Sequence, residues 1–400
     1  MKLSIITPTH RLTHLDELYE SIKNQTYKDW EWVLYLNGKA KRKNLSKEIE
    51  KDPRISIYVD YEKHSKSTNV GYIKNKAFHL GKGEILLEVD HDDLITPDCL
   101  SEVAKAFKEN PDAGFVYSHA AIVQEDGIPF NSSYGWNNPY QIEWEGKKYW
   151  CNGSFAADAG SLSLIFYAPD HIRCWRKSIY TDVGGHNENL SILDDQELLM
   201  RTYMITKFKE IEKCLYLYRV HGENTWLERN QQIQDGTKDL QREWQKRLAI
   251  YDAMKNNLEI VNLGEVDFNI HEKWPFADNS VGVLEAYHII NQIEDKQFTM
   301  SEIYRVLNDK AWAFIEIPST DGRGAFQDPR HKSYWNENSF WYWTKRSHAD
   351  FIDNHSIRFQ NFESGTNFPS EFFEENNIPC TWIYLRAKKA DTKRPGSTAI

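Results

Sequence analysis

Cysteine is scarce and shows no pairing pattern in this sequence. The five cysteines are scattered, odd in number and include no CxxC pair: Cys99, Cys151, Cys174, Cys214 and Cys380. This excludes the usual ligand spacing of a zinc site and does not indicate a disulfide framework. The pattern favours a reducing, intracellular compartment.

Long hydrophobic runs are also missing. The chain enters a strand-like segment, Lys2 to Thr9, without the charged start and apolar run of a signal peptide. No stretch approaches the length of a membrane span. We therefore expect a soluble, cytoplasmic protein without a membrane partner, in the host cytoplasm if it is phage-encoded.

Positive charge is in deficit, with 49 Lys and Arg against 59 Asp and Glu and a formal net charge of −10. This argues against broad binding to nucleic acid or anionic membranes. One stretch departs from the trend, because residues 39–82 hold twelve Lys or Arg and five Asp or Glu. Both a solvated helix surface and a face for a diphosphate or nucleic acid fit this stretch.

Four hundred residues predict two domains. In the first 120 residues, strand patterns at 2–9, 30–36, 54–61 and 84–89 alternate with helix patterns at 15–22 and 72–80. This predicts a mostly parallel α/β sheet that binds ligands beyond the carboxyl ends of its strands. Residues 124–168 look irregular and rich in tryptophan, which is typical of functional loops. We expect a first domain over 1–226, a helical connector over 227–257, a second α/β domain over 258–390 and a tail over 391–400.

An acidic group follows the buried-strand pattern of residues 85–89. Asp90 and Asp92 are two apart, so in an extended chain they point the same way and can share one ion, with Asp93 beside them. Carboxylates are the ligands that Mn²⁺ or Mg²⁺ prefers. The alternative is a helix start capped by Thr96 and Asp98, which leaves the three carboxylates ahead of it unexplained.

The first domain resembles family 2 glycosyltransferases of the GT-A fold from Lys2 to about Trp226. The motifs that carry the resemblance occur in the family's order: residues 4–11 (SIITPTHR), 21–22, 25–27, 30–32, 69–71, 74–77 and the acidic strand end. The resemblance implies a metal-dependent inverting transferase that moves a sugar from a nucleotide-sugar, expected to be a UDP-sugar, to an acceptor hydroxyl.

The resemblance also implies roles for single residues on the donor side. Pro8, Thr9 and Arg11 would lie beside the nucleoside, and Lys74 would approach the diphosphate. Asp90 would contact the ribose or the metal, and Asp92 would be the main ligand of Mn²⁺ or Mg²⁺. Asn37 stands where the family often has an acidic residue that reads the base, which weakens the case for uridine.

The acceptor side is expected further along the chain. Residues 174–177, 183–188, 194–198 and 201 resemble the family's acceptor region and would place Trp175, Gly185, His186 and Asp194 there. Asp195 is the candidate base for the acceptor hydroxyl proton. The alternative is that Asp194 and Asp195 are charges that complement a helix N-terminus. His221, in a motif like the family's closing one, is either a third metal ligand, a diphosphate contact or a structural histidine.

The second domain resembles the later part of class I methyltransferases dependent on S-adenosylmethionine, over about residues 262–343. The family's glycine-rich turn is missing, because only Val261-Asn262-Leu263-Gly264 stands in its place. We therefore expect a smaller Rossmann-like domain without bound S-adenosylmethionine, retained for packing, for homo-oligomer formation or for acceptor binding. Its aromatic cluster (Trp335, Phe340, Trp341, Trp343) is either a binding surface or core.

The acceptor is expected to be a glycan or a small molecule. Hydroxymethylated bases of phage DNA are an alternative, motivated by the basic stretch, the aromatic segment and the second domain. Two other functions stay open: a methyltransferase with an accessory sugar-binding domain, and a non-catalytic carbohydrate-binding scaffold.

Overall fold

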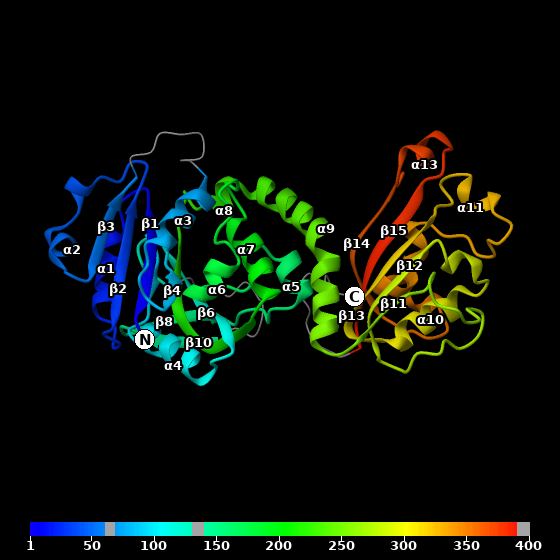
Figure 1. The fold of residues 1–400 in the computed structure, drawn as a ribbon, viewed down its shortest axis with the longest axis horizontal. Helices are drawn as coiled ribbons and strands as arrows, with labels where there is room; N and C mark the ends of the chain where they lie inside the picture. The colour runs from blue at the N-terminus through cyan, green and yellow to red at the C-terminus, as the bar shows by residue number, and fades with distance from the viewer. Residues whose placement is uncertain (61–68, 130–139, 390–400) are drawn as a thin grey trace. The chain divides into compact units, whose positions relative to one another are not determined.

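The computed structural model describes residues 1–60, 69–129 and 140–389 (Figure 1). The chain forms two compact units, Met1–Trp244 and Gln245–Ile400. The expected tail, residues 61–68 of the basic stretch and Trp136 of the aromatic segment lie outside the described residues. Within the described part of the chain, no helix is long and apolar enough to cross a membrane.

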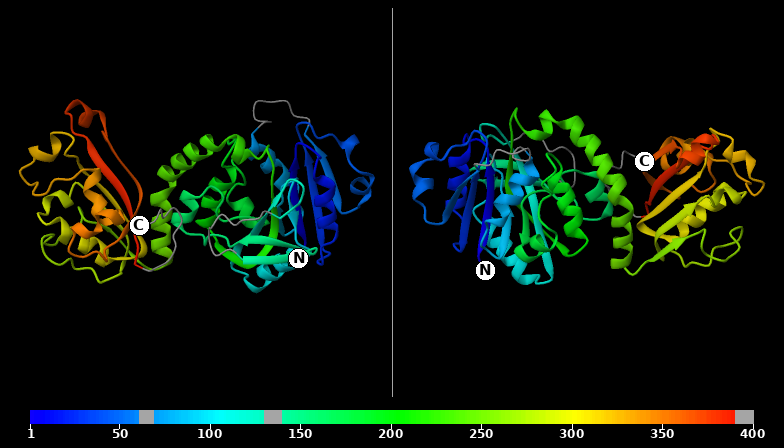
Figure 2. Two further views of the ribbon diagram at one scale, coloured as in Figure 1. Left: turned by 180° about the vertical axis from the view of Figure 1, so that it is seen from behind. Right: turned by 45° about the horizontal axis from the view of Figure 1, so that its top comes forward.

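The first unit is built on one curled sheet with strand order β3-β2-β1-β4-β9-β6-β10-β5, to which the β7–β8 hairpin is added through β6. Its strands are β1 (Leu3–Thr9), β2 (Trp30–Leu36), β3 (Ile55–Val59), β4 (Ile85–Glu88), β5 (Leu94–Ile95), β6 (Ala113–Gln124), β7 (Tyr140–Trp144), β8 (Lys147–Asn152), β9 (Arg173–Arg176) and β10 (Lys207–Val220). Strands β1 to β4 pair in parallel, whereas β9 pairs antiparallel with both β4 and β6. The blue strands β1 to β3 lie side by side in every view (Figure 2).

Helices connect and flank these strands. They are α1 (Leu15–Lys23), α2 (Lys47–Lys51), α3 (Val70–His79), α4 (Cys99–Glu109), α5 (Ala159–Leu164), α6 (Lys177–Asp182), α7 (Asp194–Tyr203), α8 (Thr225–Glu228) and α9 (Asn230–Lys255). In α1, Leu15, Leu18 and Ile22 are buried at the spacing that predicted the helix. The expected parallel α/β architecture is therefore confirmed for the start of the chain.

The segment 124–168 is more regular than the sequence indicated. Residues 140–152 form the β7–β8 hairpin, and a turn at Glu145 and Gly146, both with positive φ, joins its strands. Asp158 caps α5 by accepting hydrogen bonds from the backbone N–H groups of Gly160 and Ser161, each at 2.9 Å. The expectation of one long irregular loop was wrong for these residues, because cross-strand pairing and capping supply their backbone partners.

The second unit has its own sheet with strand order β11-β12-β13-β15-β14. Its strands are β11 (Glu259–Asn262), β12 (Val281–Tyr287), β13 (Leu307–Pro318), β14 (Phe359–Asn367) and β15 (Cys380–Ala387). Its α-helices are α10 (Lys296–Val306), α11 (Gly324–Gln327), α12 (Trp341–Thr344) and α13 (Glu371–Glu375). Strands β11 to β13 are parallel, and β15 and β14 are antiparallel additions. A second, smaller α/β unit is thus present, as expected.

The aromatic cluster of this unit belongs to its core. Trp335, Phe340 and Trp343 are almost fully buried and pack in one hydrophobic cluster, while Trp341 is partly exposed. Of the two interpretations given to the cluster, core packing describes three of its four members.

Candidate active site

Three neighbouring parallel strands end at one edge of the first sheet. Thr9 ends β1, Asn37 follows β2, and Asp90 follows the end of β4 at Glu88. The edge is held together by the backbone, because Asn37 N–H donates to the carbonyl of Thr9 at 2.8 Å. These side chains are up to about eighty positions apart in the sequence. They therefore converge at the edge where a parallel sheet binds its ligands.

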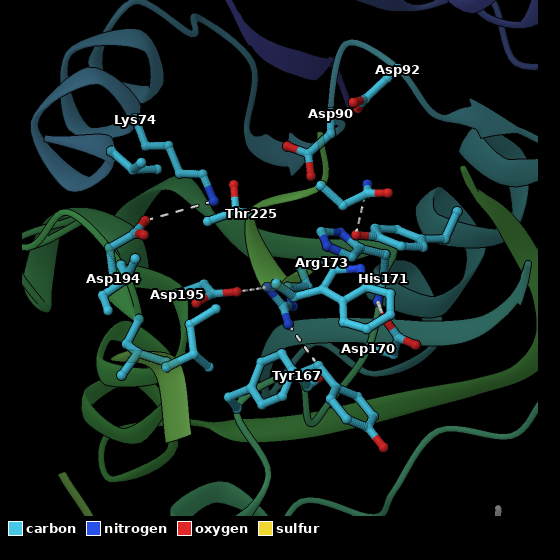
Figure 3. Close-up of a pocket in the computed structure, with 18 of the residues that line it drawn as sticks. Lys74, Asp90, Asp92, Tyr167, Asp170, His171, Arg173, Asp194, Asp195 and Thr225 are labelled. Atoms are coloured by element: carbon cyan, nitrogen blue, oxygen red, sulfur yellow. Dashed lines mark hydrogen bonds and ion pairs between the residues drawn. The ribbon is translucent and has the colours of Figure 1, made fainter. Parts of the chain in front are cut away.

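A cavity of about 710 Å³ opens at this edge (Figure 3). The predicted site residues that line it are Pro8, Arg11, Asn37, Lys74, Asp90, Asp92, Asp194 and Asp195. Thr9, Trp175, Gly185, His186 and His221 are not among its lining residues. The cavity thus brings together most of the expected donor side and both carboxylates of the expected acceptor side.

Asp92 and His221 form a close pair at the acidic strand end. The Nε2 atom of His221 lies 2.8 Å from Oδ2 of Asp92. Its Nδ1 atom accepts the backbone N–H of Glu223 at 3.2 Å, which places the ring proton on Nε2. Burial raises the pKa of Asp92, but His91 and His221 outweigh it and hold the pKa below its usual value. Asp92 is therefore anionic at neutral pH.

Asp90 lies in the cavity without a fixed counter-charge. Burial raises the pKa of its carboxyl group, and the charge of Lys74 opposes the shift. Within the described residues, no hydrogen bond or ion pair engages its side chain. A buried carboxylate of this kind is costly unless a cation compensates it. Asp90 and Asp92 therefore fit a hard divalent cation, for which their carboxylates would supply oxygen ligands, and His221 orients Asp92.

Asp93 faces away from the cavity and holds the loop in place. Its Oδ2 accepts the hydroxyl of Tyr216 at 2.6 Å, and its Oδ1 accepts the backbone N–H of Arg219 at 2.7 Å. Arg219 also donates from Nε to the carbonyl of Asp92 at 2.7 Å. These contacts tie the acidic strand end to β10, so Asp93 and Arg219 position Asp92.

Asp194 and Asp195 open helix α7 on the opposite side of the cavity. Leu193, with φ of 59°, turns the chain into the helix and does not cap it by a side-chain hydrogen bond. Both carboxylates lie in the first helical turn, where the helix dipole favours negative charge. The alternative interpretation as N-terminal helix charges is thus compatible with the geometry, and it does not prevent the same groups from facing the cavity.

The two carboxylates differ in their partners. Asp195 Oδ2 lies 2.5 Å from Nη1 of Arg173, and its Oδ1 accepts the backbone N–H of Gln196 at 2.8 Å. Burial raises the pKa of Asp195, but the charges of Arg173 and Lys74 outweigh it and lower the pKa. Asp194 has a buried Oδ2 without a hydrogen bond, 3.7 Å from both Lys74 Nζ and His186 Nε2. Burial, opposed by Lys74 and reinforced by Asp195, raises the pKa of Asp194 to about 7.

Two buried cations hold these carboxylates. Lys74 Nζ lies 2.5 Å from Oε1 of Glu88. Burial alone would lower the pKa of Lys74, but Asp194 and Glu88 raise it well above its usual value. Arg173, only 1% exposed, also donates to the carbonyls of Pro169 and Tyr167. Lys74 is therefore charged and engaged with Glu88 at the cavity wall.

Three of the expected acceptor residues belong to the core. The indole Nε1 of Trp175 donates to Thr202 Oγ1 at 3.2 Å, and Nδ1 of His186 lies 2.7 Å from the hydroxyl of Tyr180. Gly185 has φ of 69°, and a Cβ there would lie 2.3 Å from Oδ1 of Asn75. The structure thus gives these three residues packing contacts behind the cavity wall.

The sequence interpretation missed several cavity residues. Arg173 and Asp170 lie between the motifs that were recognised, and four aromatic side chains join the lining: Phe155, Phe166, Tyr167 and Trp226. For Arg173 a signal exists, because a charged residue between Ile172 and Cys174 interrupts a buried-strand pattern. Such residues are rarely fully buried without a partner.

The profile of the family described as Glycosyl transferase family 2 matches residues 4–161. The N-terminal region is a family 2 glycosyltransferase domain. The expectation of a glycosyltransferase is thus confirmed for this region, which contains the acidic strand end and Lys74.

Individual relatives are distant. Chondroitin synthase of Escherichia coli is 21% identical over 230 residues, which cover 57% of this chain and 30% of that protein. An uncharacterized glycosyltransferase of Methanocaldococcus jannaschii is 30% identical over 117 residues, covering 28% of this chain and 39% of the relative. The chain therefore spans well under half the length of these relatives.

Among solved structures, residues 1–349 of TarS from S. aureus in complex with UDP are 18% identical. That match has a TM-score of 0.42 and covers 66% of this chain and 77% of the other.

Proposed function

We propose that the chain is a metal-dependent inverting glycosyltransferase that moves a sugar from a nucleotide-sugar to an acceptor hydroxyl. The catalytic domain would comprise residues 1–226, with residues 227–257 as a helical connector. The observation that carries the proposal is that one cavity holds both carboxylate pairs, Asp90 with Asp92 and Asp194 with Asp195. A cation site and a base on opposite sides of one cavity are what displacement at an anomeric carbon requires.

The donor diphosphate would bind beside Asp90, Asp92 and His221 together with Mn²⁺ or Mg²⁺. When bound, such an ion supplies Lewis-acid stabilisation of the charge that grows on the departing diphosphate. Asp92 is ionised and would be the main ligand of the ion, and His221 would orient its carboxylate through their 2.8 Å contact. Asp93 and Arg219 would keep them in position.

The base of the donor nucleotide would lie beside Asn37. Its Oδ1 atom is buried and has no hydrogen-bond partner among the described residues. A carbonyl oxygen of this kind accepts a hydrogen bond from a ring N–H. Uracil offers such a ring N–H on its pairing edge, so Asn37 is compatible with a UDP-sugar. We retain UDP as the proposed nucleotide.

Asp195 would act as the base. It is anionic at neutral pH and can take the proton of the acceptor hydroxyl as the oxygen attacks the anomeric carbon. The new carbon–oxygen bond forms on the face opposite the diphosphate, the bond to the diphosphate breaks, and the proton ends on Asp195. Arg173 would hold the carboxylate in orientation through its 2.5 Å contact.

A glycan acceptor fits the cavity better than a base in DNA. The aromatic side chains Phe155, Phe166, Tyr167 and Trp226 line the same cavity as Asp195. Flat aromatic faces of this kind pack against the apolar faces of sugars. Two relatives are named chondroitin synthase and hyaluronan synthase, and these names also favour a glycan acceptor. Hydroxymethylated DNA is kept as the second acceptor to test, because residues 39–82 hold twelve Lys or Arg and five Asp or Glu.

The test is nucleotide release from a panel of nucleotide-sugars with Mn²⁺. Candidate acceptors are short oligosaccharides and hydroxymethylcytosine DNA, and Asp92→Asn is the active-site variant. Asp112→Asn is the matched control, because Asp112 is exposed and pairs with Lys207 away from the cavity. We expect metal-dependent release that an acceptor stimulates and that only Asp92→Asn abolishes. Release that Asp92→Asn leaves unchanged, or no release from any donor, contradicts the proposal.

For the second unit we propose a truncated methyltransferase-like domain without cofactor. Strand β11 (Glu259–Asn262) is followed by Leu263 and Gly264, so a single glycine stands after the strand where the cofactor turn would lie. Calorimetry of the protein with S-adenosylmethionine tests this, and binding at micromolar ligand would overturn it.

A further inference from the structure

We propose that the second unit contains a zinc site formed by His288, Glu316 and Cys380. One ligand atom from each of these side chains lies within 4.8 Å of the others. Within residues 1–60, 69–129 and 140–389, three side chains of metal-binding type converge this closely only here. The site is independent of the proposed transferase activity, since none of its residues lines the cavity of the first unit.

The sheet brings the three residues to one edge. His288 directly follows β12, Glu316 lies near the end of β13, and Cys380 begins β15. Cys380 pairs with Pro318, two residues after Glu316, so Cys380 and Glu316 lie on the same face of the sheet. His288 leaves the strand with φ of 54°, a left-handed conformation that departs from the strand's alternation.

The backbone fixes this edge. The N–H of His288 donates to the carbonyl of Glu316 at 2.7 Å, and the N–H of Ser319 donates to the carbonyl of Pro379 at 2.8 Å. The ring of His288 also stacks on Phe373, with centroids 5.9 Å apart. A ligand set carried by hydrogen-bonded strands and a packed ring is largely formed before any ion binds.

The distances fit tetrahedral zinc. Ligand bonds of about 2.0–2.3 Å at tetrahedral angles place neighbouring ligand atoms roughly 3.3–3.6 Å apart. Nε2 of His288 and Oε1 of Glu316 are already 3.2 Å apart. The sulfur must come closer by at most about 1 Å, which the side chains of His288 and Glu316 can accommodate because they are 37% and 28% exposed.

The ligand chemistry selects zinc over harder ions. A thiolate and an imidazole suit Zn²⁺, whereas Mg²⁺ and Ca²⁺ prefer oxygen alone. A thiolate, a carboxylate and a neutral imidazole together carry two negative charges, which one Zn²⁺ balances. Three protein ligands leave the fourth position to water.

The same three residues also allow a second interpretation, a catalytic triad in which Cys380 is the nucleophile. Cys380 has no exposed surface, so its sulfur is not accessible to a substrate. A metal ion has to reach only the three ligand atoms, and it can enter past the partly exposed side chains of His288 and Glu316. The geometry therefore favours an ion.

The experiment is a titration of the full, chelator-treated chain with Co²⁺, a spectroscopic substitute for zinc. A thiolate bound to Co²⁺ gives a charge-transfer band in the near ultraviolet. The proposed ligands in the first unit are oxygen and nitrogen atoms, so this band reports only on a cysteine site. Excess Zn²⁺ should abolish the band, and Zn²⁺ should raise the melting temperature of the protein.

Cys380→Ser should remove the band. Glu316→Gln and His288→Ala should weaken Co²⁺ binding at the site at least about 100-fold, which is more than the loss of a residue that only orients a ligand would cost. His355→Ala is the matched control, because His355 is an exposed histidine of the same unit, and it should keep the band. The two variants of the partly exposed side chains keep the test valid if Cys380→Ser does not fold. No band in the native chain, a band that survives in folded Cys380→Ser, or wild-type affinity in both other variants would overturn the proposal.

Discussion

The assignment of the base is the prediction with the sharpest test, because two adjacent carboxylates compete for the role. Asp194→Asn and Asp195→Asn are isosteric changes at neighbouring positions of one helix, so each is the control for the other. If Asp195 takes the proton, Asp195→Asn should lower kcat about 10²- to 10⁴-fold, equivalent to roughly 2.7–5.5 kcal/mol of barrier. Asp194→Asn should stay within about tenfold of the native rate, because it removes no group that touches reacting atoms.

The pH profile separates the two carboxylates independently of the variants. A base works only when deprotonated, so activity falls as the pH drops through its pKa. Arg173 and Lys74 overcome the effect of burial and keep the pKa of Asp195 below its usual value, so Asp195 stays ionised throughout the range from pH 5 to 8. The pKa of Asp194 is about 7. With Asp194 as base, kcat/KM would fall about 50-fold between pH 7 and pH 5, whereas with Asp195 it should change little.

The assay is initial-rate nucleotide release at saturating Mn²⁺, in the native protein and both variants, with circular dichroism as a check of folding. Groups other than the two carboxylates affect all three proteins alike, so the comparison isolates Asp194 and Asp195. A 50-fold acidic fall in the native protein, together with an inactive Asp194→Asn and an active Asp195→Asn, would refute the assignment.

Three further changes follow from the contacts. Lys74→Met should destabilise the fold by about 3–5 kcal/mol, because it leaves Glu88 buried without its nearest cation, and adding Glu88→Gln should restore much of the loss in thermal unfolding. Asn37→Ala should raise the KM for the donor about 10- to 100-fold without a comparable change in kcat, and equal kinetics would contradict base recognition by this amide. Asp93→Asn should lower stability by about 1–3 kcal/mol, because an amide NH2 group replaces one of the two oxygens that accept from the Tyr216 hydroxyl and the Arg219 backbone N–H. In folded Asp93→Asn, calorimetry should then find a weaker affinity for Mn²⁺, since the loop that carries Asp92 loses its anchor.

The start of the chain could be predicted because its signals are local. β2 was expected at 30–36 and is found at Trp30–Leu36, where an apolar run ends at a turn signal. The expected helix at 72–80 corresponds to α3, Val70–His79. The hairpin at residues 140–152 was missed although residues 140–144 alternate apolar and polar side chains, because residues 147–152 do not keep that alternation. The hairpin joins the sheet only where β8 pairs with β6, a tertiary contact that single-sequence periodicity does not report.

The candidate site was only partly accessible to sequence reasoning. Motif resemblance predicted Asp92 and Asp195, which line the cavity, because each stands at the end of a recognisable element. It also included Trp175 and His186, whose place in the motif does not reveal that they point into the core. The His288, Glu316 and Cys380 cluster was excluded by the spacing rule for zinc ligands, since those rules describe ligands close in sequence. Here the ligands are up to 92 positions apart and meet through strand register.

The charges around Asp195 explain how Asp194 and Asp195 can lie side by side in a buried group. Glu88, Asp194 and Asp195 share two buried cations, Lys74 and Arg173, so the group carries one negative charge too many. The surplus is removed most easily by protonating the carboxylate with the fewest partners. That carboxylate is Asp194, whose Oδ2 lacks a hydrogen bond and whose pKa is near 7. By taking up the proton, Asp194 reduces the repulsion on Asp195 and leaves it ionised beside Arg173. Asp194→Asn imitates this protonated state at every pH, so the variant should keep Asp195 ionised and active as base from pH 5 to 8.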